Sequence, residues 1–127
     1  MGEKPELNGA CVLVVEDEYL VALDLQIEIE RSGATVLGPV GRLAAALDLA
    51  GRATPLDVAV LDVNLHGENV FPVADVLAER GIPFVFATGQ DQESIPERHR
   101  VAVRLSKPIV LDVLLRHLAE ITQARLR

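Results

Sequence analysis

Short apolar runs alternate with longer amphipathic stretches along almost the whole chain. The runs lie at residues 11–15, 34–41, 57–62, 83–89 and 101–108. The first and third runs are rich in branched aliphatic side chains and lack a polar face, which is typical of strands buried on both sides. Stretches with helical character follow at residues 16–33, 42–52, 68–81, 91–100 and 109–126.

Residues that start and stop helices and strands support these boundaries. The first helical stretch opens on acidic residues and closes on Gly33, and the third closes on Gly81 with Pro72 near its first turn. Gly38 and Pro39 are expected to end the second strand. The stretch over 91–100 is a poor helix because Pro96 interrupts it.

Strict alternation of strand and helix predicts an α/β fold with a parallel sheet covered on both faces. We expect the flavodoxin-like arrangement of five β/α units, a doubly wound five-stranded sheet with strand order 2-1-3-4-5. With 127 residues and no internal linker, the chain reads as one domain over residues 1–127. Residues 1–9 are expected to form a loose tail, and no output domain is predicted.

Composition narrows the class of protein. Half of the residues are hydrophobic and only 3% are aromatic, so the core is expected to be aliphatic. The net charge of −7 argues against binding to nucleic acid. Cys11 is the single cysteine and lies in an apolar run, where we expect a small buried side chain rather than a disulfide. No segment resembles a signal peptide or a membrane span, so we expect a reducing, cytoplasmic setting.

Polar residues gather where the predicted strands end. Glu16 and Asp17 follow the first strand, and Asp62 ends the third. The fourth strand ends at Thr88, and the fifth leads into Lys107. Because ligands bind beyond the carboxyl ends of parallel strands, we expect these side chains to meet.

Three crowded carboxylates repel one another, and a divalent cation removes that repulsion. Oxygen ligands without histidine or cysteine at a suitable spacing favour Mg²⁺ or Ca²⁺. A lysine and a hydroxyl at the same rim favour an anion such as a phosphoryl group. Asp62 is then a candidate nucleophile, because carboxylates form aspartyl phosphates.

These motifs, in this order, resemble the receiver domain of two-component response regulators. The resemblance runs from about Cys11 to the end of the chain. It implies that Asp62 is the phosphoacceptor and Lys107 its ion-pairing lysine, with a cis bond to Pro108. It also implies that Thr88 is the switch hydroxyl. The implied Mg²⁺ ligands are Asp17, its acidic neighbour Glu16, Asp62, and the main-chain carbonyl of Asn64.

The segment Phe86-Ala87-Thr88-Gly89 is similar to the motif of the FATGUY receivers, often free-standing proteins of alphaproteobacteria. The resemblance implies a histidine kinase, possibly of the HWE type, or a histidine phosphotransferase as the donor. Arg104 stands where most receivers have an aromatic residue, and the subgroup as a whole lacks that aromatic. It is interpreted either as an exposed charge on an edge strand or as a polar lever, a side chain that replaces the aromatic and contacts a partner or the fourth loop. Gln90 and Asn64 occupy positions that tune dephosphorylation in the family.

Other interpretations stay open at this point. Asp62 on its own is also typical of a helix cap or turn. A phosphatase of the haloacid-dehalogenase type also uses a strand-end Asp, but it needs a second Asp where this chain has Asn64. A pseudo-receiver that binds partners without phosphorylation is the third possibility. His66, His99 and His117 show no ligand spacing and are interpreted as structural, with His66 near enough to modulate the site.

We therefore expect a phosphoacceptor of a phosphorelay rather than a metabolic enzyme. The downstream protein is unknown, and no nucleic acid or membrane is expected to bind. A monomer, or a weak homodimer through the apolar stripe of the last helix, is predicted. Residues 90–100 are expected to be the most mobile segment and to become ordered on phosphorylation.

Overall fold

The computed structural model of the chain describes residues 6–89 and 95–125. Its main sheet contains β1 (Cys11–Val15), β2 (Thr35–Val40), β3 (Val58–Asp62), β6 (Phe84–Thr88) and β7 (Val103–Ser106). All neighbouring strands are parallel, and their order is β2-β1-β3-β6-β7. Counting only these strands, the order is 2-1-3-4-5, which confirms the predicted doubly wound fold.

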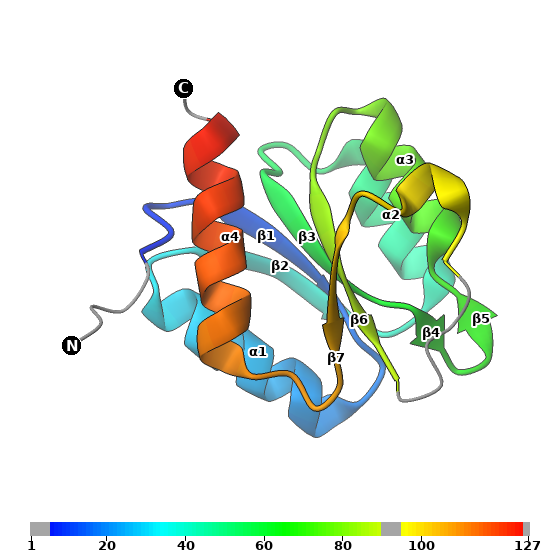
Figure 1. Cartoon of the computed structure of the whole chain (residues 1–127), viewed down its shortest axis with the longest axis horizontal. Coiled ribbons are helices and arrows are strands. Elements are labelled where there is room, and N and C mark those ends of the chain that lie inside the picture. Colours follow the sequence, from blue (N-terminus) through cyan, green and yellow to red (C-terminus); the bar gives the residue numbers. More distant parts are fainter. Residues whose placement is uncertain (1–5, 90–94, 126–127) are drawn as a thin grey trace.

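The helices cover both faces of this sheet (Figure 1). The pair α1 (Tyr19–Arg31) and α4 (Leu111–Arg125) packs on one face. The pair α2 (Leu43–Arg52) and α3 (Phe71–Glu79) packs on the other. Strand β3 is central and therefore buried from both sides, with no residue from Val58 to Leu61 more than 1% exposed. This double burial explains why the run is apolar without alternation.

The second strand was predicted to stop at Gly38 and Pro39, and that prediction is wrong. Strand β2 continues through both residues to Val40, with an irregular register opposite Leu13–Val15. Because β2 is an edge strand, the missing N–H of Pro39 costs no hydrogen bond within the sheet. Gly38 has φ +88°, and a Cβ there would lie 2.7 Å from the backbone nitrogen of Val40, so glycine is required.

The prediction of a loose tail over residues 1–9 is wrong for its described part. Leu7 is 2% exposed and packs into the core beside α1 and α4. Its N–H donates to the carbonyl of Ser32 at 2.7 Å, and the N–H of Gly9 donates to that of Gly33 at 2.8 Å. The tail is therefore anchored to the end of α1 from Leu7 onward.

The poor helix predicted over residues 91–100 is a short 3₁₀-helix, Glu97–His99, in its described part. Its His99 is buried, and its ring lies against all three phenylalanines of the chain, with centroids at 5.4–6.5 Å. His99 Nε2 lies 2.7 Å from Oδ1 of Asp75 on α3. The expected mobility of residues 90–94 lies outside the described residues.

The structure also contains a hairpin that was not predicted. Strands β4 (Asn64–Leu65) and β5 (Glu68–Asn69) pair in an antiparallel manner directly after β3. Cys11 is buried, as predicted. No helix in the described part of the chain is both long and apolar enough to cross a membrane.

Candidate functional site

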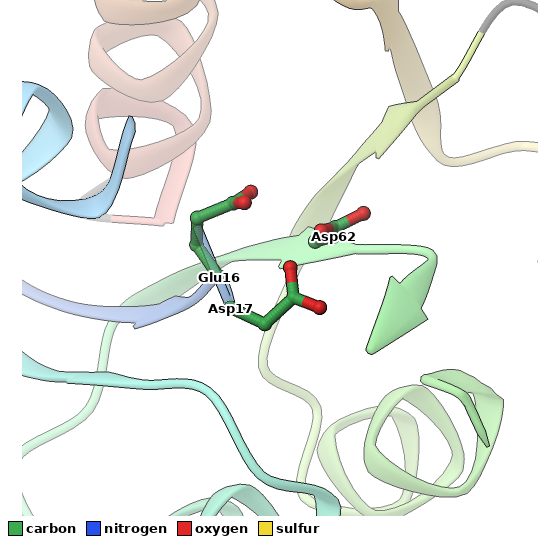
Figure 2. A group of neighbouring side chains, drawn as sticks. All are labelled: Glu16, Asp17 and Asp62. Carbon is green, nitrogen blue, oxygen red and sulfur yellow. The ribbon is translucent and has the colours of Figure 1, made fainter. Parts of the chain in front are cut away.

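Three carboxylates meet at the carboxyl end of the sheet. Glu16 and Asp17 follow β1, and Asp62 is the last residue of the neighbouring strand β3. One oxygen atom from each lies within 4.8 Å of those from the other two. Figure 2 shows the three side chains at the ends of these strands, with Asp17 directed toward Asp62. The sheet order alone therefore brings together the acidic residues that the sequence placed at the rim.

Lys107 joins the two most deeply buried of these acids. Its Nζ lies 3.1 Å from Oδ2 of Asp62 and 3.1 Å from Oε2 of Glu16, with Oε1 of Glu18 at 3.6 Å. Glu16 and Asp62 are only 3% and 5% exposed. Lys107 comes directly after β7, and its N–H donates to the carbonyl of Thr88 at 2.8 Å. That bond holds the lysine close to the end of β6.

Burial and mutual repulsion change the protonation of this cluster. Burial, followed by the charge of Asp62, raises the pKa of Glu16 to about 7. Burial also raises the pKa of Asp62, although Lys107 and the N–H of Asn64 act in the opposite direction. For Lys107, burial alone lowers the pKa, but bonds to Asp62 and Glu16 outweigh it and raise the pKa. The single positive charge of Lys107 is therefore too little to neutralise the carboxylates that surround it.

This donor set fits a hard divalent cation. The cluster offers carboxylate oxygens alone, which suits Mg²⁺ better than Zn²⁺. A cation would also relieve the repulsion that raises the pKa of Glu16. Among residues 6–89 and 95–125, no other group of three His, Cys, Asp or Glu side chains is close enough to hold a metal ion.

The backbone around the acids is shaped to bring them together. Gly41 packs against the loop after β1, where a Cβ would lie 3.1 Å from Cα of Asp17 and 3.3 Å from the carbonyl of Glu16. The N–H of Glu18 donates to Oε1 of Glu16 at 3.1 Å. The N–H of Asn64 donates to Oδ1 of Asp62 at 3.2 Å.

Thr88 is 3% exposed and ends β6, one residue after Ala87, which pairs with Asp62 in the sheet. The hydroxyl-bearing residue therefore lies on the strand next to the predicted phosphoacceptor. The Lys107–Pro108 peptide bond is cis, as the resemblance implies. Gln90 lies outside the described residues.

Arg104 lies on the edge strand β7 beside Phe86, and its side chain is exposed. It forms no salt bridge with any residue in the described part of the chain. Its exposure on an edge strand fits the first interpretation, and the second, a contact with a partner or with the loop after β6, stays a prediction.

Two contacts at the site were not predicted individually, although His66 was expected to lie near enough to modulate the site. The first is the approach of Glu18 to Lys107, although the acidic triplet at residues 16–18 was a visible signal. The second comes from His66, whose N–H donates to Oδ2 of Asp17 at 2.8 Å and whose Nδ1 lies 3.4 Å from the same oxygen. Asp17 and His66 are 49 positions apart in the sequence, so no local pattern reveals this contact.

Comparisons with known proteins identify the kind of fold that carries this site. No family model matches the chain. It is similar to SdrG from Sphingomonas melonis, with 41% identity, a TM-score of 0.77, and coverage of 90% of this chain and 97% of SdrG. A structure of the BeF3-activated conformation of SdrG matches with a TM-score of 0.70.

Two further matches agree. A response regulator receiver protein from Sinorhizobium medicae has the same fold, with 22% identity, a TM-score of 0.77, and coverage of 94% of this chain and 99% of that one. The transcriptional regulatory protein PdtaR of Mycobacterium tuberculosis is 29% identical over 108 residues, covering 82% of this chain and 52% of PdtaR. The chain thus spans about half the length of this curated relative.

Proposed function

Because the chain belongs to the receiver domains of response regulators, we propose that it accepts a phosphoryl group from a phosphohistidine donor onto Asp62. The observation that carries this proposal is the contact of Lys107 Nζ, at 3.1 Å, with both Asp62 and Glu16. Phosphoryl transfer depends mainly on positioning and charge neutralisation. The buried carboxylate of Asp62 provides the positioned acceptor. The ammonium group of Lys107, beside Oδ2 of Asp62, and a cation in the acidic pocket would provide the charge neutralisation.

The proposed step forms one bond and breaks one. An oxygen of Asp62 attacks phosphorus, the phosphorus–nitrogen bond of the donor breaks, and the leaving imidazole takes up a proton from solvent. Lys107 donates to one oxygen of the phosphoryl group, and the hydroxyl of Thr88 donates to another. Water then attacks the phosphorus of the aspartyl phosphate, which releases inorganic phosphate and returns the free carboxylate of Asp62.

Four residues would hold the cation that the acidic pocket suits. Glu16, Asp17 and Asp62 would offer carboxylate oxygens, and Asn64 its main-chain carbonyl. When bound, Mg²⁺ supplies positive charge to the oxygens of the group being transferred. Lys107 keeps its charge because its pKa is raised, so it can pair with the phosphoryl group as the cation does.

We propose a histidine kinase, possibly of the HWE type, or a histidine phosphotransferase as the donor. Exposed apolar side chains on α1 and at the start of α4 support a docking site on these elements. Leu20 on α1 is 73% exposed. A separate cavity of about 410 Å³ is lined by Val21 and Leu25 of α1 and by Lys107, Pro108 and Ile109, among others. We name the exposed apolar residues of α1 and of the start of α4 the donor patch: Tyr19, Leu20, Leu23, Ile27, Val110 and Val113.

The predicted homodimer would use the apolar stripe of α4. Leu114 and Leu118 of the α4 stripe are fully buried against the sheet, so they are not free to bind a second copy. Val110 and Val113 remain exposed, and we assign them to the donor patch rather than to a dimer.

We further propose that residues 1–127 act as one receiver domain in the cytoplasm, with output through a protein contact.

The rival functions have less support. A phosphatase of the haloacid-dehalogenase type needs a proton donor at position 64, and the amide of Asn64 cannot serve as a general acid. Its Oδ1 already accepts the N–H of Gly67 at 2.7 Å. A pseudo-receiver would not need Lys107 between Glu16 and Asp62.

The test is incubation with acetyl phosphate or phosphoramidate in Mg²⁺, followed by intact mass measurement. We expect an adduct of one phosphoryl group in the unaltered protein and none in Asp62→Asn. Absence of an adduct with either donor would overturn the proposal. Sustained turnover of a phosphomonoester would favour the phosphatase.

A further inference from the structure

The hairpin that follows β3 ends in a tight turn at the edge of the acidic site. Its strands pair Asn64 with Asn69 and Leu65 with Glu68, which leaves a two-residue loop. The loop residues His66 and Gly67 have φ values of +49° and +87°. Two positive φ values in succession are typical of the type I′ turn. A histidine in this conformation is unusual and costs free energy, so a local contact is expected to compensate.

That contact is with the carboxylates of the proposed cation site. The N–H of His66 donates to Oδ2 of Asp17 at 2.8 Å, and the N–H of Asn64 donates to Oδ1 of Asp62 at 3.2 Å. The N–H of Gly67 donates to Oδ1 of Asn64 at 2.7 Å, which closes the turn on itself. The hairpin therefore bonds to two of the three carboxylates through its main chain.

The hairpin is anchored firmly enough to act as a support. Leu65 is 1% exposed and Val70 is fully buried, so the core holds the hairpin on both sides of its exposed turn. The N–H of Val70 also donates to the carbonyl of Val63 at 2.9 Å. A donor fixed in this way keeps its direction whether or not the acceptor carries a ligand.

We propose that this hairpin is a positioning element for the cation site, acting through the main-chain N–H of His66 on Asp17. A bond to Oδ2 fixes the orientation of the carboxylate and leaves its other oxygen for a cation. Groups that orient metal ligands in this way commonly change metal affinity about 10- to 100-fold. The imidazole is secondary, because Nδ1 is 3.4 Å from Oδ2 on a side chain that is 75% exposed.

This inference rests on the proposed function only for the identity of the cation ligands. Its test is the dissociation constant of Mg²⁺, measured by calorimetric titration of the full chain without any phosphodonor. If Gly67→Ala weakens Mg²⁺ binding and Asp62 is never phosphorylated, the positioning role stands and the proposed function fails. If Asp62 is phosphorylated but Mg²⁺ binds Gly67→Ala as tightly as the unaltered protein, the proposed function stands and the positioning role fails.

Gly67→Ala strains the turn without a clash, since no atom lies within 4 Å of the added Cβ. We expect its Mg²⁺ dissociation constant to rise roughly tenfold. Gly81→Ala is the matched control, because Gly81 has φ +71° in equally open space at the end of α3. It should lose comparable stability and keep the Mg²⁺ affinity; equal affinity losses in both variants would overturn the inference.

A third variant separates the main chain from the imidazole. His66→Gly keeps the N–H and suits the turn, so it should lose less affinity than Gly67→Ala; an equal loss would overturn the main-chain role. Amide exchange in the unaltered protein gives an answer that does not depend on any variant folding. We expect the His66 amide to be protected with and without Mg²⁺, and exchange at the rate of a free surface amide would refute the contact.

Discussion

Asp62→Asn is expected to stabilise the metal-free protein, although it removes the proposed phosphoacceptor. In the native structure Asp62 and Glu16 are buried with oxygen atoms within 4.8 Å of each other. At an effective dielectric constant of about 20, two charges at that distance repel by about 3.5 kcal/mol. Neutralising one of them removes the repulsion.

The net gain is smaller than this for two reasons. Lys107 lies 3.1 Å from both acids and offsets part of their repulsion. Burial, rather than Asp62, is the larger cause of the raised pKa of Glu16. The amide of the variant can still accept a hydrogen bond from Lys107. We therefore expect a gain of about 1–2 kcal/mol in the free energy of unfolding at pH 8.

The gain should depend on pH with a defined sign. Glu16 has a pKa of about 7 in the folded protein against 4.5 for the free group. A carboxyl group shifted upward contributes stability that is complete below its unfolded pKa and is lost as the pH rises through the folded one. Removing the Asp62 charge lowers the pKa of Glu16 and reduces that loss. The advantage of the variant should therefore shrink between pH 8 and pH 5.

Urea denaturation followed by circular dichroism measures the effect, since the chain has no tryptophan. EDTA keeps the protein metal-free, and Glu120→Gln on an exposed part of α4 is a control with the same change in charge. Saturating Mg²⁺ should narrow or reverse the difference, because a ligand at 100 times its dissociation constant stabilises by about 2.7 kcal/mol. A variant that is no more stable than the unaltered protein in EDTA at pH 8 would refute the reasoning.

Three further predictions concern other parts of the molecule. Leu20→Glu should block transfer from a cognate kinase but not from acetyl phosphate. Val101→Glu, at a position that is even more exposed but lies outside the donor patch, should affect neither, and equal transfer to both variants would count against the docking surface. Lys107→Met should destabilise the metal-free protein by about 3 kcal/mol at pH 8, since it leaves buried carboxylates unpaired, and unchanged urea unfolding would contradict this. Gly38→Ala should cost about 1–3 kcal/mol because it forces a side chain into the positive φ of Gly38 on β2, and a thermal midpoint equal to that of the unaltered protein would show that position 38 does not require glycine.

The sequence allowed the main fold to be predicted because its signals are local. The run from Val58 to Leu61 is apolar since helices cover both faces of β3, and that cause acts at every position of the run. The meeting of Asp17 and Asp62 also followed, because the strand order of this fold makes β1 and β3 neighbours.

The features that were missed depend on tertiary context. Gly38 and Pro39 usually end a strand, but at a sheet edge they cost β2 no hydrogen bond. The strands of the β4–β5 hairpin have two residues each, too few for any periodic pattern. The bond from His66 to Asp17 joins a turn to a loop from a different part of the chain. Such contacts emerge only after the sheet has formed.

The central claim is that Asp62, and no other residue, receives the phosphoryl group. Sodium borohydride reduces an aspartyl phosphate to homoserine, so it marks the acceptor permanently. The protein would be phosphorylated with acetyl phosphate and Mg²⁺, reduced, digested and sequenced by mass spectrometry. We expect homoserine at position 62 alone, with none in a sample that received no phosphodonor. Homoserine at position 17, phosphate on Thr88, or an unmodified position 62 in phosphorylated protein would contradict the assignment.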